Sequence, residues 1–264
     1  MSMKTVVITG SSRGIGYGLA NEFLVRGCNV VVNGRSQASV DKAIASLSQV
    51  HSSERLVGQA GDVTSPDDHQ ALWDTAVAKF GKVDIWINNA GVGHPMINVW
   101  EIPVEKVHQI VDIDLKGLIF GSQVAIRGML QQGQGHLYNM EGFGSNGRTR
   151  AGISLYGATK SAVRFLSRSL TKETAATPVK VSTLSPGIVI TDFITEQYED
   201  DPEGLESAKK VFNTLGDKVE TVTPWLVEQV LANEKSGASI EWLTSFKIIK
   251  RFATARFNQR DLFS

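Results

Sequence analysis

A tyrosine and a lysine four residues apart give this chain a pair of side chains suited to proton transfer. Tyr156 and Lys160 stand in the segment YGATK, and residues at this spacing share one face of a helix. An ammonium group beside a phenol stabilises the phenolate, so we expect Lys160 to lower the pKa of Tyr156 from about 10. Such a tyrosine can give a proton to a carbonyl oxygen or take one from an alcohol. Alone, the spacing fits an ordinary surface pair equally well.

A glycine-rich turn near the N-terminus supplies a second chemical feature. The sequence TGSSRGIG occupies residues 9–16, between an expected strand at 4–8 and an expected helix at 15–26. The free N–H groups and the dipole of a helix N-terminus favour a pyrophosphate. We expect Gly10 to allow the turn, Gly14 to let the backbone approach phosphate, and Gly16 to let the helix pack on the strand. An ordinary strand-to-helix turn is the alternative.

The residues after the second expected strand indicate which dinucleotide binds. Proteins that bind NAD usually place an acid there, which accepts a hydrogen bond from the ribose 2′-hydroxyl. Here Asn33, Arg35 and Ser36 occupy this stretch without an acid, and Arg13 lies in the glycine turn. Two guanidinium groups would suit a 2′-phosphate, unless both are only solvated surface residues. We therefore predict NADP(H) as the cofactor.

Strand and helix patterns alternate along the chain. Strands are expected at 4–8, 29–33, 55–60, 83–88, 135–140, 179–184 and 239–243, with helices at 15–26, 37–50, 66–80, 103–132 and 155–175. Strands separated by single helices form a doubly wound parallel sheet. Because no composition break divides the chain, we predict one Rossmann-type α/β domain over residues 1–264, with helices on both faces of the sheet.

Composition narrows the possible partners. Lysine plus arginine equals aspartate plus glutamate, at 27 each, so the overall charge does not indicate nucleic-acid binding. A single cysteine cannot form an intrachain disulfide, and no apolar run reaches membrane-spanning length. The first strand begins so early that no leader is expected, which predicts a cytoplasmic protein. The histidines lack the spacing of a metal site, so no metal is expected.

Five motifs in order resemble the short-chain dehydrogenase/reductase family over essentially the whole chain. They are TGSSRGIG at 9–16, Asp62-Val63, NNAG at 88–91, YGATK at 156–160 and SPGIVIT at 185–191. The resemblance implies an NAD(P)-dependent oxidoreductase acting on alcohols or carbonyls, usually as a homodimer or homotetramer. It also implies that residues 62–63 contact the adenine and that residues 89–91 lie beside the cofactor. Residues 186–189 would hold the carboxamide, and Thr191 would contact a phosphate. The predicted cofactor-binding residues are Gly10, Ser12, Arg13, Gly14, Ile15, Gly16, Asn33, Arg35, Ser36, Asp62, Val63, Asn89, Ala90, Gly91, Tyr156, Lys160, Pro186, Gly187, Val189 and Thr191.

One departure from the family pattern lies at the end of the fifth expected strand. Gly142, preceded by Glu141, stands where the family usually has a serine that hydrogen-bonds the substrate oxygen. Losing a donor of this kind costs a few kcal/mol of transition-state stabilisation. A backbone N–H, Ser145, Asn146 or a water held by Glu141 could replace it.

A second departure lies in the segment VDIDLKG at 111–117. Asp114 stands where the family usually has an asparagine that holds a water of the proton relay at a helix distortion. An aspartate could keep that water, but it adds a charge near Lys160. We therefore count Asp114, together with Tyr156 and Lys160, among the catalytic residues.

The segment HLYNMEGFGSNGR at 136–148 resembles plant chlorophyll b reductases and their bacterial relatives. The resemblance implies NADPH-dependent reduction of an aldehyde on a large apolar ring, the 7-formyl group of chlorophyll b, to a hydroxymethyl group. A glycine at 142 would make room for such a ring. The alternatives are a ketoreductase for a smaller carbonyl and a non-catalytic NADP(H)-binding sensor, which would have no need of Tyr156. The predicted substrate pocket comprises His94, Glu141, Gly142, Phe143 and Phe193.

Two C-terminal segments are expected to lie outside the dinucleotide fold. Residues 192–220 mix apolar and acidic side chains, which is typical of a substrate lid but also of a polar surface loop. In residues 244–264, Phe246, Ile249 and Phe252 share one helical face, with Lys250 and Arg256 among the basic residues on the others. Such a segment either lies on an anionic membrane surface or packs on its own domain or a partner subunit.

Overall fold

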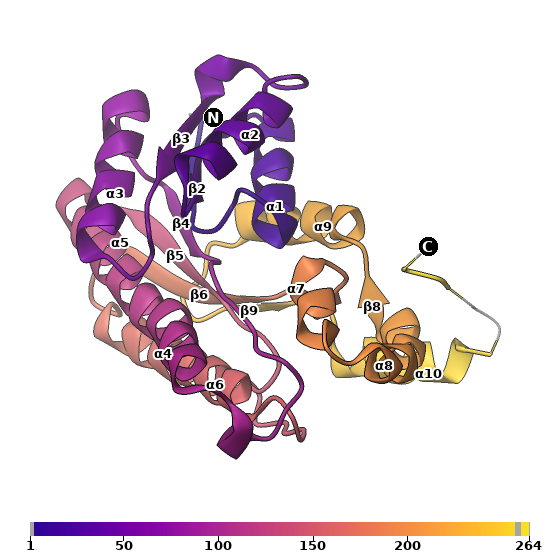
Figure 1. Ribbon diagram of the computed structural model, residues 1–264. Coiled ribbons are helices and arrows are strands. Elements are labelled where there is room, and N and C mark those ends of the chain that lie inside the picture. The colour runs from indigo at the N-terminus through magenta and orange to yellow at the C-terminus, as the bar shows by residue number, and fades with distance from the viewer. Residues whose placement is uncertain (1–2, 257–259, 264) are drawn as a thin grey trace.

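The centre of the protein is a parallel β-sheet (Figure 1). The computed structural model describes residues 3–256 and 260–263, and within them the sheet has seven strands. In spatial order these are β3 (Leu56–Ala60), β2 (Asn29–Gly34), β1 (Thr5–Ile8), β4 (Ile85–Asn88), β5 (Gly135–Met140), β6 (Val179–Ser185) and β9 (Ser239–Glu241). The chain order reverses between β1 and β4, which makes the carboxyl ends of these two strands the expected ligand crevice. The predicted doubly wound α/β fold is confirmed.

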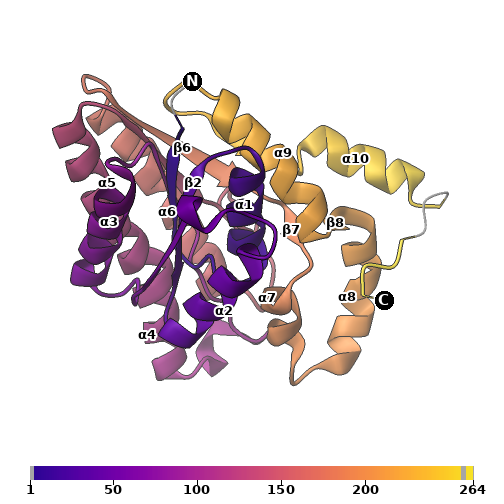
Figure 2. The ribbon, with the colours of Figure 1, turned by 90° about the horizontal axis from the view of Figure 1, so that it is seen from above.

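Helices cover both faces of the sheet (Figure 2). Side chains alternate along a strand, so Val6 and Ile8 of β1 pack on one face while Val7 packs on the other. The first face carries α1 (Gly14–Val25), α2 (Gln37–Leu47) and α9 (Val219–Ala232). The second carries α3 (Pro66–Phe80), α5 (Leu118–Gln132) and α6 (Ser154–Glu173).

The helix predicted over residues 103–132 is distorted in its middle. It consists of α4 (Val104–Val111), a π-helical segment η3 (Asp112–Gly117) and α5. A hydrophobic pattern of period 3.6 does not reveal such a wide turn. The distortion lies at Asp114, where the family resemblance implied it.

The chain after β6 has more structure than the polar region expected from the sequence. A second, two-stranded parallel sheet pairs β7 (Ile188–Val189) with β8 (Gly216–Asp217). Around it lie α7 (Asp192–Thr195), η4 (Glu196–Tyr198), α8 (Pro202–Leu215) and α10 (Ser245–Thr254). We call residues 188–217 and 245–256 the outer segment, because Figure 1 shows its helices beside the main sheet rather than on it.

Short 3₁₀ turns complete the described chain at η1 (Ser53–Arg55) and η2 (Val99–Glu101). None of the helices in residues 3–256 has both the length and the apolar character that crossing a membrane requires. Of the basic segment predicted at 244–264, residues 257–259 and 264 lie outside the described residues, as do residues 1–2 of the predicted domain.

Candidate active site

The glycine turn joins β1 to α1 at the carboxyl edge of the sheet. Gly10 has a φ of +61°, which a side chain would strain, and a Cβ on Gly16 would lie 2.4 Å from the carbonyl oxygen of Gly10. No described side chain caps the N-terminus of α1, which starts after Arg13. The first N–H groups of this helix, including that of Ile15, therefore remain available to an anion.

Two asparagines hold this turn in place. The Asn89 amide donates to the carbonyl oxygens of Thr9 and Gly10, at 2.9 and 3.1 Å. The Asn33 side chain accepts from the Gly10 N–H at 3.1 Å and donates to the carbonyls of Gln59 and Gly61. Because these bonds lie within the protein, Asn33 and Asn89 position the turn, and we assign their side chains no direct contact with a cofactor.

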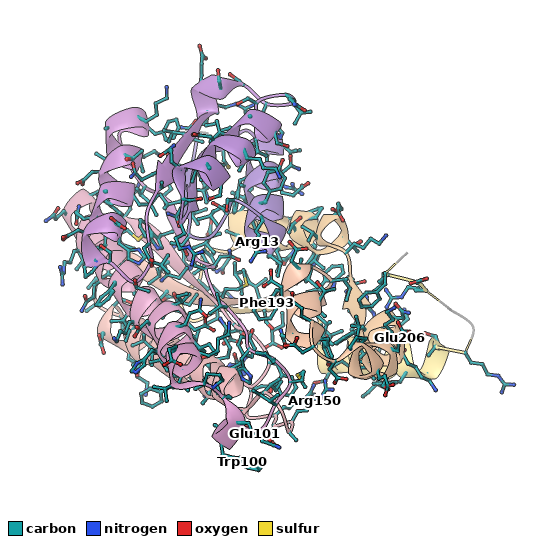
Figure 3. All side chains as sticks on the ribbon, viewed as in Figure 1. Arg13, Trp100, Glu101, Arg150, Phe193 and Glu206 are labelled. Carbon is teal, nitrogen blue, oxygen red and sulfur yellow. The ribbon has the colours of Figure 1, made fainter. Side chains whose placement is uncertain are left out.

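The two arginines predicted to bind a 2′-phosphate have different surroundings. Arg13 pairs with Glu196 at 2.8 Å and with Asp192 at 3.4 Å, where the sheet meets the outer segment (Figure 3). Arg35 is exposed, and no partner is found for it among the described residues. Ser36 caps α2 by accepting from the Ser39 N–H. Arg35 is therefore the freer of the two guanidinium groups.

The remaining cofactor residues of the prediction lie around the same edge. A Cβ on Gly14 would lie 3.8 Å from Cγ2 of Thr191, so the glycine turn meets the segment after β7. A Cβ on Gly91 would lie 3.3 Å from Nζ of Lys160, which joins the cofactor edge to the catalytic residues. The other predicted positions lie in the turn itself, follow the strands at this edge or, for Val189, belong to β7: Ser12, Asp62, Val63, Ala90, Pro186, Gly187 and Val189.

The structure brings together the three predicted catalytic residues. Lys160 and Asp114 are both buried, and Lys160 Nζ lies 3.7 Å from Asp114 Oδ2. The same ammonium group lies 5.5 Å from the ring centre of Tyr156. Asp114 Oδ1 also accepts from the Val92 N–H at 2.8 Å, so the carboxyl group ties the loop after β4 to Lys160. Burial raises the pKa of Asp114, and the charge of Lys160 opposes this rise.

The pKa of Tyr156 differs from the prediction. Burial raises it, and the nearby Asp114 raises it further. The predicted lowering of this pKa by Lys160 is wrong, because burial of the phenol is the dominant influence on it. A phenol with a raised pKa stays protonated at neutral pH and can act as a proton donor.

Gly142 lies directly against the hydroxyl of Tyr156. A Cβ on Gly142 would lie 2.2 Å from Tyr156 Oη and 3.1 Å from Cγ of Lys160. No side chain fits there while the tyrosine keeps its position. The expectation that this glycine makes room for a substrate therefore needs correction, because the tyrosine hydroxyl takes that room.

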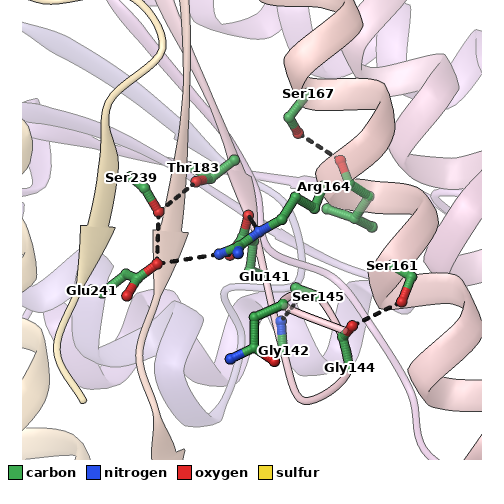
Figure 4. A network of polar contacts seen from close by, with 12 residues as sticks. Glu141, Gly142, Gly144, Ser145, Ser161, Arg164, Ser167, Thr183, Ser239 and Glu241 are labelled. Carbon is green, nitrogen blue, oxygen red and sulfur yellow. Dashed lines mark hydrogen bonds and ion pairs between the residues drawn. The ribbon is translucent and has the colours of Figure 1, made fainter. Parts of the chain in front are cut away.

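Among the proposed replacements for the serine, the hydroxyl of Ser145 is best placed. Ser145 Oγ accepts from the N–H of Gly142 at 3.1 Å, so that N–H is already engaged (Figure 4). Asn146 Oδ1 accepts from the Arg148 N–H, away from this bond. Ser145 keeps a hydroxyl hydrogen to donate, since its oxygen acts as the acceptor in the bond to Gly142.

Glu141 belongs to an ion-pair network rather than to the substrate pocket of the prediction. Its buried carboxylate receives two hydrogen bonds from Arg164, at 2.8 and 2.5 Å, and Arg164 reaches Glu241 at 3.2 Å (Figure 4). This bidentate pair joins the end of β5 to α6 and β9, and leaves the carboxylate engaged. Sequence analysis missed Arg164, although it lies one turn after Lys160 on the same face of α6.

His94 also uses its polar atoms within the protein. Its Nδ1 lies 2.7 Å from the Pro95 carbonyl oxygen, and its Nε2 accepts from the Tyr156 N–H at 3.4 Å. The buried imidazole thus ties the loop after β4 to the start of α6. Phe193 of α7 does reach the site, since its ring centre lies 5.5 Å from that of Tyr156.

A hollow of about 250 Å³ lies between the loop after β5 and α6. Its α6 residues are Ser154, Gly157, Ala158 and Ser161, on the side of the helix away from Tyr156. This hollow is therefore distinct from the place where a carbonyl would meet the tyrosine. Phe143 is 40% exposed and lines the hollow, so its role as a substrate contact stays a prediction.

Comparison with known proteins shows the class that this fold and site define. The family model described as short chain dehydrogenase matches residues 4–202, and the chain belongs to this family of oxidoreductases. Its members use a nicotinamide dinucleotide, which supplies or accepts hydride. The open N-terminus of α1 and the glycine turn fit the pyrophosphate of such a cofactor.

Individual relatives show which members of the family this chain is similar to. A probable chloroplastic chlorophyll(ide) b reductase of Arabidopsis thaliana is 35% identical over 268 residues, 96% of this chain and 53% of that protein. A second chlorophyll(ide) b reductase of the same plant is 36% identical over 251 residues, 92% of this chain and 70% of that protein. An uncharacterised oxidoreductase of Staphylococcus aureus is 33% identical over 205 residues, 77% of this chain and 85% of that protein. The chain thus spans about half the length of the first relative.

A solved structure agrees with the fold. The 3-ketoacyl-(acyl-carrier-protein) reductase from Brucella melitensis, complexed with NADH, superposes with a TM-score of 0.77 at 24% identity. The match covers 90% of this chain and 96% of that chain. It confirms the Rossmann-type architecture.

Proposed function

We propose that this protein uses NADPH to reduce the carbonyl group of a large apolar substrate. The position of the Tyr156 hydroxyl carries the proposal: a Cβ built on Gly142, just after β5, would lie 2.2 Å from it. The phenol therefore lies at the carboxyl edge of the sheet, the edge that also carries the glycine turn where the family binds its cofactor. Lys160, which is paired with Asp114, lies beside the phenol ring, where the pair can resupply the proton that the tyrosine gives up.

Burial raises the pKa of Tyr156, so the phenol stays protonated and suits the role of proton donor. A protonated phenol can donate to a carbonyl oxygen that gains negative charge. Lys160, which is paired with Asp114, is placed to stabilise the phenolate that remains. We assign Ser145 the second hydrogen bond to the carbonyl oxygen, in place of the serine that Gly142 replaces.

The choice of NADPH follows from the end of β2. No acid stands after this strand, and the exposed Arg35 can meet a 2′-phosphate there. Arg13 would reach the same phosphate only by leaving Glu196 and Asp192. We therefore assign the preference mainly to Arg35.

The apolar character of the substrate is inferred from Phe193 of α7, whose ring lies beside that of Tyr156. Ile194, the next residue, packs with Met96 and Ile188 against the apolar cluster of the outer segment. The chlorophyll(ide) b reductases among the relatives suggest a substrate of this kind. We propose the 7-formyl group of chlorophyll b, which would become a hydroxymethyl group, with residues 192–220 as the cover of the site.

The organisation of the working enzyme is also part of the proposal. We propose one domain over residues 1–264 that assembles as a homodimer or homotetramer in the cytoplasm. Light scattering of the purified protein tests the assembly directly.

Single-turnover reduction tests the proposed reaction. Purified protein would be mixed with NADPH and detergent-solubilised chlorophyll b, and the pigment product separated and identified. We expect a hydroxymethyl product from the wild type, a rate lower by roughly 10²–10⁴-fold for Tyr156→Phe, and weaker turnover with NADH. Rapid turnover of small carbonyls without any pigment product would favour the smaller ketoreductase. An unchanged rate in Tyr156→Phe would contradict the catalytic assignment.

A further inference from the structure

Helix α10 presents an apolar face that the described residues leave uncovered. Phe246 is 77% exposed, Ile249 is 68% exposed and Phe252 is 55% exposed. A spacing of three residues places them in one stripe along the helix. Figure 2 shows α10 at the outer side of the molecule, beyond α9 and away from the main sheet. Large apolar side chains gathered in this way indicate an interaction surface.

The charges beside this stripe are all positive. Residues 245–256 include Lys247, Lys250, Arg251 and Arg256 and no acidic residue. If two copies of this helix met face to face, they would bring like charges together. An anionic lipid surface would instead complement the basic residues while it covers the apolar ones.

The opposite side of α10 is fastened to the protein. Arg251 pairs with Asp217 of β8 at 2.8 Å and donates to the Leu215 carbonyl at 2.7 Å. Asp217 also accepts from the Trp242 indole N–H at 2.6 Å, and Nζ of Lys247 lies 2.9 Å from the centre of that indole ring. These contacts fix the rotation of the helix, so that the apolar stripe faces outward.

The same fastening links α10 to the candidate active site. Asp217 lies opposite Val189 in the β7–β8 pair, and Val189 belongs to the segment that the family places at the nicotinamide. Helix α8, which comes directly before β8, belongs to the proposed cover of the site. A surface that binds α10 would therefore also bring the entrance of the active site close to that surface.

We propose that α10 is an interfacial helix that binds an anionic lipid surface. Phe246, Ile249 and Phe252 enter the boundary between headgroups and acyl chains, while Lys250 and Arg256 meet lipid phosphates. Lipid binding itself does not depend on the proposed reaction; only its use in collecting an apolar substrate from the lipid rests on the proposed function.

Vesicle sedimentation tests this proposal with the full-length protein. The vesicles would be pure phosphatidylcholine or phosphatidylcholine with about 30% phosphatidylglycerol. We expect the wild type to bind the anionic vesicles at low salt, to be released by high salt, and to bind the neutral vesicles weakly. The triple variant Phe246→Ser/Ile249→Ser/Phe252→Ser should bind at least about tenfold more weakly. Lys250→Gln should weaken binding by about fivefold.

A matched control separates this surface from general hydrophobicity. Val50 is 72% exposed in the turn after α2, far from the outer segment in sequence, and Val50→Ser should bind vesicles like the wild type. All variants should keep wild-type circular dichroism, and NADPH binding serves as the check on the fold. Failure of the wild type to bind anionic vesicles would overturn the proposal, as would equal binding by the triple variant. A mass that falls from dimer to monomer only in the triple variant, without wild-type lipid binding, would assign the face to a second copy instead.

Discussion

The glycine turn and the outer segment meet at the active site but are held together by different forces. The turn is built from backbone contacts too close for any side chain, such as that between Gly16 and Gly10, and from short bonds of Asn33 and Asn89. The outer segment depends on one small apolar cluster and on ion pairs centred on Asp217. A ligand site needs a fixed floor, whereas a cover must be able to separate from it. The difference therefore matches the roles proposed for the two regions.

The largest effect is expected in the glycine turn. In Gly16→Ala, the new Cβ would lie 2.4 Å from a backbone oxygen and 2.6 Å from Nδ2 of Asn89. Since neither the backbone nor this bonded amide can move freely, we expect a loss of about 3 kcal/mol or more in the free energy of unfolding, together with loss of NADPH binding. Urea unfolding and calorimetric titration measure both. Gly157→Ala is the control, because a Cβ there would lie 4.0 Å from Cα of Gly144, an ordinary contact distance. Equal stability of the two variants would mean that the turn is not rigid.

Removing the carboxylate at 217 should affect the outer segment alone. Asp217→Ala leaves Arg251, Arg260 and the Trp242 indole N–H without their shared acceptor. We expect a loss of about 3 kcal/mol in local stability, because a buried charge partner disappears. Hydrogen exchange should rise in α10 and β8 but not in the main sheet. The exposed pair of Glu206 and Lys209 is the control, where Glu206→Gln should change stability by less than about 0.5 kcal/mol. Faster exchange throughout the sheet would refute the separation of the two regions.

Acid should destabilise the main sheet through His136. Burial, followed by the charges of Lys180 and Lys4, lowers the pKa of this histidine to about 3. The unfolded chain binds a proton below about pH 6.5 while the folded chain does not, so stability falls as the pH drops from 6.5 toward 3. Between pH 7 and pH 5, we expect His136 to lower the free energy of unfolding by about 2 kcal/mol. Urea unfolding at both pH values should show a shallower pH dependence in His136→Gln. An unchanged pH dependence in this variant would show that other titratable groups cause the loss of stability.

The smallest effect concerns the arginines at the cofactor edge. We expect Arg35→Ala to raise the Kd of NADPH about tenfold and to leave that of NADH nearly unchanged, because a charge-assisted bond to phosphate is lost. Arg13→Ala should raise the Kd of NADPH by a smaller factor, since Arg13 already pairs with Glu196. Fluorescence titration with both nucleotides measures the difference. A larger effect of Arg13→Ala would show that its pairs open when the cofactor binds.

The sheet and the cofactor edge could be predicted because they depend on local patterns. Alternating strands and helices determine which residues lie at the carboxyl edge, and a glycine needed for close approach is visible in the sequence. Tyr156, Lys160 and Asp114 were brought together as expected, since helix spacing and the family motif place them.

The details of the reacting centre could not be predicted because they depend on contacts between distant residues. The raised pKa of Tyr156 reflects burial, which spacing along a helix does not reveal. The pairing of Glu141 with Arg164 needed the position of α6 against β5. Residues 192–220 and 244–264 were expected to lie outside the dinucleotide fold, but their packing could not be predicted, because their helices are held by Asp217 and by a cluster of apolar residues drawn from several segments.

The most direct test of the account is the single-turnover rate of carbonyl reduction in Gly142→Ser. This change restores the residue that the family usually has at this place, yet its Cβ would lie 2.2 Å from the Tyr156 hydroxyl. If that hydroxyl occupies the space as described, the rate should fall by at least about a hundredfold while NADPH still binds. A rate equal to or above that of the wild type would contradict the account, because it would show that the site accepts a serine and that the tyrosine acts from another position.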